Sequence, residues 1–95
     1  MVDFRIHRLG DSVGVATRDL SRGHRAVGRY VDEKEGEDIT IEMAEDVSLG
    51  HKIALVRLSE GQQVIEYGVT IGAATADVEV GKHVHVHNLK GLRWA

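Results

Sequence analysis

The sequence contains no cysteine and no proline, and only one Phe, two Tyr and one Trp among its 95 residues. Without cysteine it can form no disulfide, thiolate metal site or cysteine nucleophile, so a metal site must use histidine, carboxylate or carbonyl ligands. Such ligands suit iron, manganese or zinc. With so few aromatic rings, the core must consist mainly of Val, Ile, Leu and Ala, which favours a small β-rich body. The eleven glycines are the only strong turn signals left.

The chain also lacks a long apolar run and an excess of basic residues. No stretch approaches the roughly eighteen apolar residues of a membrane span, and the start of the chain lacks the apolar segment of a signal peptide. The formal net charge is −3, and acids interrupt the basic clusters, which argues against nucleic-acid binding. We therefore expect a cytoplasmic protein with neither nucleic acid nor membrane as a partner.

Apolar and polar residues alternate in several short stretches, which is the pattern of β-strands. Residues 3–7, 12–17 and 39–43 are each expected to form a strand, and the acidic segment 32–38 a solvated loop. No stretch is convincingly helical over three turns. We therefore predict an all-β fold in one compact domain, since 95 residues leave no room for a second.

One turn motif occurs four times: an aliphatic residue, two variable residues, a glycine, and a new strand two residues later. The copies are residues 19–26, 46–53, 57–64 and 77–84. Each glycine is expected to take a positive φ, which a side chain would resist. The copies are unevenly spaced, so the motif is a reused turn and not a solenoid repeat. Gly68 and Gly72, inside an extended run, suggest a bend, a bulge or close approach of another backbone.

Three of the six histidines, His83, His85 and His87, stand at every second residue of the segment 81–89. This alternation predicts a strand with the imidazoles on one face and the intervening valines on the other. Neighbouring histidines would lie about 7 Å apart between Cα atoms and could share a metal ion, whereas His83 and His87 would lie about 13 Å apart. At most two of the three should then be ligands. The alternative is an edge strand whose polar residues face water.

Four motifs in the second half of the chain keep the order and spacing of a known family. They are Gly50–Leu55, Glu66–Gly68, Ile71–Thr75 and His85–Leu89. With them the chain resembles the altronate dehydratase family, and more narrowly its small SAF-type domain, found also in the alpha subunit of (2R)-sulfolactate sulfo-lyase. The resemblance covers nearly the whole chain. It implies a β-clip fold and a part in a lyase that removes water or sulfite from an acidic 2-hydroxy substrate with the help of a divalent metal, Fe²⁺ or Mn²⁺.

The resemblance also implies catalytic roles for three residues. His51 and Lys52 match the family's Gly-His-Lys motif, and Tyr67 matches its Tyr-Gly motif. In β-elimination, His51 could be a base or a ligand, Lys52 could hold the substrate carboxylate, and Tyr67 could donate a hydrogen bond. Each has a structural alternative: a loop histidine, a solvated lysine and a packed ring. His7 and His24 have no partner motif and are expected to be surface residues.

The metal ligands implied by the resemblance are His85 and His87, which match its His-x-His-Asn motif. His83 falls where the family varies and is expected to be incidental. Asn88 should bond to backbone and fix the end of the strand. Glu66 could orient an imidazole or bind metal, but a solvent-facing carboxylate is the simpler interpretation.

Longer members of the family continue into a large catalytic domain. We therefore expect this chain to be inactive alone and to act with a separate large catalytic lyase subunit on a small acidic substrate, sharing the metal with that partner. Homo-oligomerisation stays open, as does the choice among altronate, galactarate-like acids and sulfolactate. The alternative is a non-catalytic SAF-type carbohydrate-binding or assembly module, because fold alone does not settle function.

The predicted single domain, residues 1–95, has three parts. Residues 1–49 supply the N-terminal strands and the acidic loop, and residues 50–89 carry the motifs. Residues 90–95 form a tail with the single tryptophan, Trp94. Because a large apolar ring is costly to leave in water, Trp94 should be docked, either on its own domain or on a partner.

Overall fold

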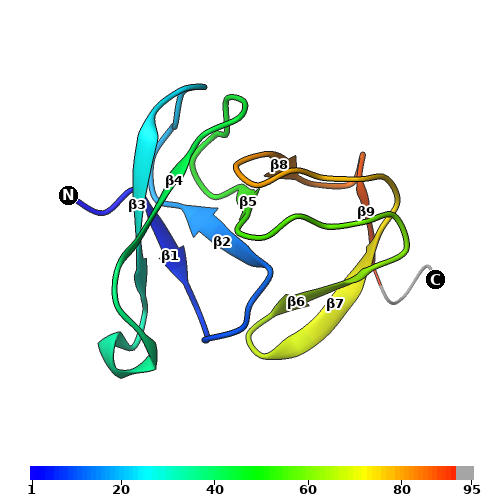
Figure 1. Cartoon of the computed structure of the whole chain (residues 1–95), viewed down its shortest axis with the longest axis horizontal. Coiled ribbons are helices and arrows are strands. Elements are labelled where there is room, and N and C mark those ends of the chain that lie inside the picture. Colours follow the sequence, from blue (N-terminus) through cyan, green and yellow to red (C-terminus); the bar gives the residue numbers. More distant parts are fainter. Residues whose placement is uncertain (92–95) are drawn as a thin grey trace.

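The computed structural model describes residues 1–91, and its regular structure is almost entirely β (Figure 1). The strands are β1 (Phe4–Ile6), β2 (Val13–Ala16), β3 (Arg25–Tyr30), β4 (Ile39–Glu42), β5 (Lys52–Ala54), β6 (Gln63–Glu66), β7 (Val69–Ala74), β8 (His83–Val84) and β9 (Leu89–Gly91). One 3-10 turn, η1 (Glu33–Glu35), lies in the predicted acidic loop and contributes no buried residue. The all-β prediction is confirmed. Within residues 1–91 there is no helix long and apolar enough to cross a membrane.

Strand β1 occupies the middle of a six-stranded sheet with the order β4-β3-β1-β2-β5-β8. It pairs in parallel with β3 and antiparallel with β2, and the remaining strand pairs are antiparallel. A second sheet has the order β6-β7-β9 and lies beside the β5 and β8 end of the first (Figure 1). Ser12 links the two sheets: its amide donates to the Ile65 carbonyl over 2.8 Å, and its hydroxyl accepts from the Ile65 amide over 3.0 Å.

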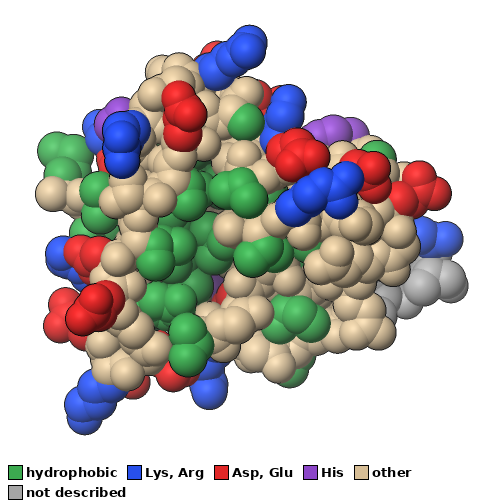
Figure 2. Space-filling model, viewed as in Figure 1, with side chains coloured by type: hydrophobic (Ala, Val, Ile, Leu, Met, Phe, Trp, Pro, Cys, Tyr) green, Lys and Arg blue, Asp and Glu red, His purple; other side chains and the backbone are tan. Residues whose placement is uncertain are grey.

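Two buried apolar clusters form the core. The first contains Phe4, Ile6, Ala16, Leu20, Ala26, Tyr30, Met43, Val47 and Ile53. The second contains Val13, Ala54, Leu58, Val64, Ala74, Val78 and Val84. Adjacent residues of β5, Ile53 and Ala54, belong to different clusters because successive side chains of a strand point to opposite faces. Figure 2 shows apolar side chains gathered at the middle of one face of the molecule, with charged side chains around its edge.

The four copies of the turn motif adopt one conformation. Their glycines have φ values between 83° and 87°, and the residue after each glycine donates its amide to the carbonyl three positions earlier. The aliphatic residues of the motif are buried and pair two by two: Leu20 bridges to Val47, and Leu58 bridges to Val78. The predicted turns are therefore confirmed, and the structure adds that they are packed in pairs.

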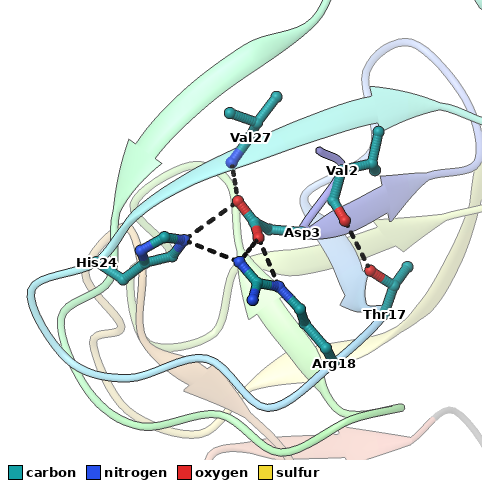
Figure 3. A network of polar contacts seen from close by, with 6 residues as sticks. All are labelled: Val2, Asp3, Thr17, Arg18, His24 and Val27. Carbon is teal, nitrogen blue, oxygen red and sulfur yellow. Dashed lines mark hydrogen bonds and ion pairs between the residues drawn. The ribbon is translucent and has the colours of Figure 1, made fainter.

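Asp3, directly before β1, bonds to strand β3 and to residues of the segment between β2 and β3 (Figure 3). Its carboxylate accepts hydrogen bonds from the Val27 amide (2.8 Å) and from the Arg18 guanidinium, and His24 Nε2 lies 3.2 Å from Asp3 Oδ2. Burial alone would raise the pKa of Asp3, but these hydrogen bonds and the charge of Arg18 lower it below its ordinary value. His24 is exposed, as expected for a surface residue, and its imidazole lies beside this carboxylate.

Close packing explains Gly72. A Cβ atom at this position would lie 2.2 Å from the carbonyl oxygen of Lys90 on β9, so only glycine allows β7 and β9 to approach. Gly68 instead forms a tight turn between β6 and β7, with φ of 73°. Both expectations for these glycines are confirmed. The predicted docking of Trp94 lies outside the described residues.

Candidate functional site

The segment 81–89 folds as a short strand followed by a tight turn. Strand β8 ends at Val84, and the amides of Asn88 and Leu89 both donate to the carbonyl of His85, over 3.0 and 2.8 Å. Val86, expected to pack, is 81% exposed. The prediction of one continuous strand through this segment, with Val86 packed, is therefore wrong, although the rings of His85 and His87 both lie against that of His83.

The side chain of Asn88 is the physical reason for this turn. Its Oδ1 accepts from the His85 amide over 2.9 Å, and its Nδ2 donates to the His83 carbonyl over 2.8 Å. Asn88 is only 8% exposed, so these bonds have little competition from water. An asparagine side chain that hydrogen-bonds to nearby backbone groups takes the place of the hydrogen bonds that a continued strand would make with its neighbour. The expected role of Asn88, to bond to backbone at the end of the strand, is confirmed.

The turn brings three histidines together, which we call the histidine cluster: His51, His83 and His85. One ring nitrogen from each lies within 4.8 Å of the others. His51 Nδ1 and His83 Nε2 are 2.8 Å apart, a hydrogen-bond distance. His87 lies against the cluster, with its ring centroid 5.3 Å from that of His83. On a straight strand this last pair would have been far apart.

Strand pairing explains why His51 and His83 meet. His83 pairs directly with Ile53 of the neighbouring strand β5, and His51 stands two residues before Ile53, so the three side chains share one face of the sheet. His83 is fixed further by its amide, which donates to Glu45 Oε1 over 2.7 Å.

The histidine cluster has the chemistry of a metal site. Burial lowers the pKa of His83, and the nearby charges of His51, His87 and His85 lower it further. The neutral imidazole is the form that binds a metal ion. Three nitrogens around one ion at about 2.1 Å each would need only small side-chain rotations from the present positions. Three imidazoles fit such an ion and leave coordination positions for other groups.

The predicted ligands His85 and His87 border different hollows. His85 lines a hollow of about 300 Å³ with Lys52, which we call the Lys52 hollow. Its other walls are Val84, Val86, Leu89 and Gly91. His87 lines a separate hollow of about 220 Å³ together with Glu45 and Lys82. The choice of His85 and His87 stays a prediction, and His83 is now a competing candidate for the second ligand.

Lys52 shares a hollow with His85, one member of the histidine cluster, and also contacts a second group of side chains. It pairs with Val84 across the sheet and therefore points to the face opposite Ile53 and His83. Its Nζ lies 3.9 Å from Glu66 Oε1. Lys52 therefore has two neighbours: the hollow that it lines with His85 on one side, and the buried carboxylate of Glu66 on the other.

Glu66 is buried, contrary to the expectation of a solvent-facing carboxylate. It is only 4% exposed, and its second oxygen, Oε2, lies 3.6 Å from His7 Nε2. Burial raises the pKa of Glu66; the charges of Lys52 and His7 oppose this, and that of Asp11 adds to it. The sequence contained a clue, because Glu66 stands two residues after the core residue Val64 and so shares its face.

Tyr67 stacks on His7, with ring centroids 3.8 Å apart and planes 20° apart. Its φ of 58° is the only positive value at a non-glycine residue among residues 1–91. Buried Asp11 holds this conformation by accepting hydrogen bonds from the amides of Tyr67 (3.1 Å) and Gly68 (3.0 Å). Such backbone strain is often kept at functional sites. The expectation that His7 is a simple surface residue is wrong: only 21% of its side chain is exposed.

The sequence-predicted residues other than His87 thus fall into two groups, and Lys52 belongs to the second while sharing a hollow with His85 of the first. The first is the histidine cluster, with His51 and His85. The second, which we call the Glu66 cluster, consists of His7, Lys52, Glu66 and Tyr67. Sequence reasoning placed Tyr67 in the site but missed His7, because the two residues come from segments of different sheets and meet only where those sheets pack together.

Fold and site together define a small all-β domain with a histidine cluster at a sheet edge and a lysine-lined hollow beside it. The family model of the altronate/galactarate dehydratase SAF domain matches residues 5–92. The chain therefore belongs to this family, which confirms the resemblance and the SAF-type β-clip fold.

Relatives of two kinds are similar to the chain. It is 35% identical over 94 residues to the alpha subunit of (2R)-sulfolactate sulfo-lyase from Chromohalobacter salexigens, a match that covers 98% of both chains. It is 41% and 37% identical over 86 residues to the altronate dehydratases of Escherichia coli and Bacillus subtilis. Those matches cover 90% of this chain but only 16% of either dehydratase.

Proposed function

We propose that the chain is the small subunit of a lyase that eliminates water or sulfite from an acidic 2-hydroxy substrate, in complex with a separate large catalytic subunit. The similar sulfo-lyase chain is named as a subunit, and the similar dehydratases contain much additional sequence. The observation that carries the proposal is the position of Lys52 and His85 in one hollow, next to the histidine cluster.

Lys52 would hold the substrate carboxylate. Its ammonium group is a compact charge on a flexible stem, suited to an anionic oxygen. The Lys52 hollow, at about 300 Å³, is at the lower end of volumes that enclose a small ligand. A partner subunit docked over the hollow would supply the remaining walls and exclude water from the reaction.

The histidine cluster would hold the divalent metal, either Fe²⁺ or Mn²⁺. When bound, such an ion supplies a Lewis acid for the charge that develops on the substrate and the leaving group. His85 belongs to both candidate ligand sets, since it is one of the sequence-predicted pair and one of the three clustered histidines. His51 and His83 complete the set that the geometry favours.

Co-expression with the large subunit tests this function. The complex and each subunit alone would be assayed with altronate, galactarate and (2R)-sulfolactate, by the 2-keto acid formed and, for the last, by released sulfite. We expect turnover of one of these acids only by the complex. If the large subunit alone were as active as the complex, the chain would instead be an assembly module.

A further inference from the structure

Glu66 carries a buried carboxylate that the proposed chemistry does not use. The residue is only 4% exposed, and Lys52 Nζ lies 3.9 Å from its Oε1. This distance is too long for a hydrogen bond, so the two groups interact through the attraction of opposite charges. The pair therefore brings a negative charge next to the lysine that is to hold the substrate.

The charge of Glu66 is not explained by packing. An ionised carboxylate costs stability when it is taken out of water, whereas a glutamine of similar shape has no charge to desolvate. Burial raises the pKa of Glu66, and the charge of Lys52 is the main influence that opposes this rise. A buried carboxylate that opposes folding in this way points to a role in the site.

Lys52 contacts Glu66 and also lines the Lys52 hollow, together with His85. Its side chain is 35% exposed, whereas that of Glu66 is 6% exposed and is not one of the walls of the hollow. Within residues 1–91, Glu66 is the one carboxylate at ion-pair distance from Lys52. Because the ammonium group sits on a flexible four-carbon stem, it can turn toward Glu66 or toward a carboxylate bound in the hollow.

The carboxylate that Lys52 is proposed to hold is present in both the substrate and the product. Elimination of water or sulfite from a 2-hydroxy acid leaves this carboxylate on the resulting 2-keto acid. A lysine that binds the one therefore binds the other about equally well. Such uniform binding does not speed the chemical step, and it slows the release of product. A second carboxylate that competes for the ammonium group would weaken the binding of both acids.

We propose that Glu66 is the counter-ion of Lys52 when the hollow is empty and competes there with the carboxylate of the substrate, an inference that rests on the proposed function. When a carboxylic acid enters the hollow, the ammonium group turns from Glu66 toward it. When the 2-keto acid leaves, Glu66 takes its place beside Lys52. Glu66 thereby limits how tightly the site holds carboxylic acids and favours release of the product.

The test compares complexes of the large subunit with the unmutated chain, Glu66→Gln and Glu60→Gln. Glu60 is exposed and is the matched control. Steady-state turnover gives kcat and KM, and saturation-transfer NMR gives the dissociation constant of pyruvate, a simple 2-keto acid. We expect Glu66→Gln to lower KM and the pyruvate dissociation constant about tenfold each while kcat stays within about threefold, because substrate and transition state gain equally. Glu60→Gln should leave all three values within about twofold of those of the unmutated complex.

A double-mutant cycle with Lys52→Met shows whether Glu66 acts through the lysine. In the Lys52→Met background the ammonium group is absent, so we expect Glu66→Gln to change the pyruvate dissociation constant by less than about twofold. An equal gain in pyruvate affinity with and without Lys52 would mean that Glu66 repels the acid directly, and the competing role would be wrong.

Two further results would overturn the inference. One is a pyruvate dissociation constant that stays within about threefold in Glu66→Gln, or rises. The other is a Glu66→Gln chain that unfolds at a lower temperature than the unmutated chain at pH 7, because Glu66 would then serve the fold. Turnover by the unmutated complex leaves the proposed function standing in either case. Pyruvate binding needs no turnover, so it tests the role of Glu66 even where the complex is inactive.

Discussion

Leu20 and Val47 exchange both of their backbone hydrogen bonds: the Leu20 amide donates to the Val47 carbonyl over 2.8 Å, and the Val47 amide donates back over 2.9 Å. Two distant turns of the same sequence motif are thereby locked against each other. Leu58 and Val78 are joined in the same way, over 2.8 and 2.7 Å. The repeated motif is therefore a unit of packing as well as a way to reverse the chain.

Replacement of turn glycines should reveal which copies of the motif are tightly packed. Gly23 and Gly81 have nearly equal φ values of 87° and 85°. A Cβ atom at Gly23 meets nothing within 4 Å, whereas one at Gly81 lies 2.3 Å from the Glu42 carbonyl oxygen. We expect Gly23→Ala to lower the free energy of unfolding by about 1–2 kcal/mol, the penalty of the left-handed conformation alone. Gly81→Ala should lower it by about 3 kcal/mol or more. Equal losses in urea denaturation would show that the backbone around Gly81 relaxes freely.

Asn88→Ala should loosen the turn that assembles the histidine cluster. The variant leaves the His85 amide and the His83 carbonyl without their partners. Each lost buried hydrogen bond costs about 1–2 kcal/mol, so we expect a loss of about 2–3 kcal/mol in the free energy of unfolding. Val86→Ala, in the same turn but exposed, is the control and should change stability by less than about 0.5 kcal/mol. Equal stability of the two variants would contradict the structural role of Asn88.

Lowering the pH should remove the contribution of Asp3 to stability. The folded-state pKa of Asp3 lies below its ordinary value of 3.8, so its contribution is complete above about pH 5. It is lost as the pH falls below the ordinary pKa and through the folded one. We expect Asp3→Asn to destabilise the protein at pH 7 by about 1–3 kcal/mol and by less at pH 3. Glu37→Gln removes one negative charge at an exposed position and is the control. Its effect on the melting temperature should be the same at pH 7 and at pH 3.

Glu66 should behave in the opposite sense. Its pKa is raised above the ordinary value of 4.5, so its ionisation opposes folding, and its unfavourable contribution grows as the pH rises through the window between the two values. We expect Glu66→Gln to unfold at a higher temperature than the unmutated protein at pH 7. This gain should shrink at pH 4, where the carboxyl group is mostly protonated in both states. A gain at pH 4 that vanishes at pH 7 would mean that the ion pairs with Lys52 and His7 outweigh burial.

The metal ligands can be assigned by binding to the isolated chain. His85→Gln should weaken Mn²⁺ binding at least about tenfold, because His85 belongs to both candidate sets. If the ligands are the three clustered histidines, His51, His83 and His85, then His83→Gln should weaken Mn²⁺ binding by a similar factor. His87→Gln should then weaken it by less than about threefold. The reverse order would support the pair predicted from sequence. Calorimetric titration of the three variants and the unmutated chain measures these differences.

The fold was largely predictable because its signals are local. Alternating apolar residues located the first strands. The four glycine turns were recognised because each contains the same short motif of an aliphatic residue, two variable residues and a glycine. The segment around His83 misled the same reasoning, since the alternation there is genuine but Asn88 supplies hydrogen bonds that end the strand. Local periodicity cannot weigh one side-chain amide against a ladder of backbone bonds.

The candidate site was predictable only in part. His51, Lys52, Tyr67 and His85 were identified from motifs, and the structure places each of them in one of the two clusters. The position of His7 could not be foreseen, because its contact with Glu66 joins residues far apart in the chain. His7 follows a strand of the six-stranded sheet and Glu66 lies in the three-stranded sheet, so their contact depends on how the two sheets pack, which local sequence patterns do not reveal.

The central position of β1 has a consequence for biosynthesis. Residues 4–6 leave the ribosome before both of their sheet neighbours, so during translation they stay unpaired until β2 and β3 have followed. The histidine cluster is completed only when residue 85 emerges, because its members come from both sides of the late-forming pair β5 and β8. The proposed three-histidine metal site would therefore be complete only after residue 85 has been synthesised and β8 has paired with β5.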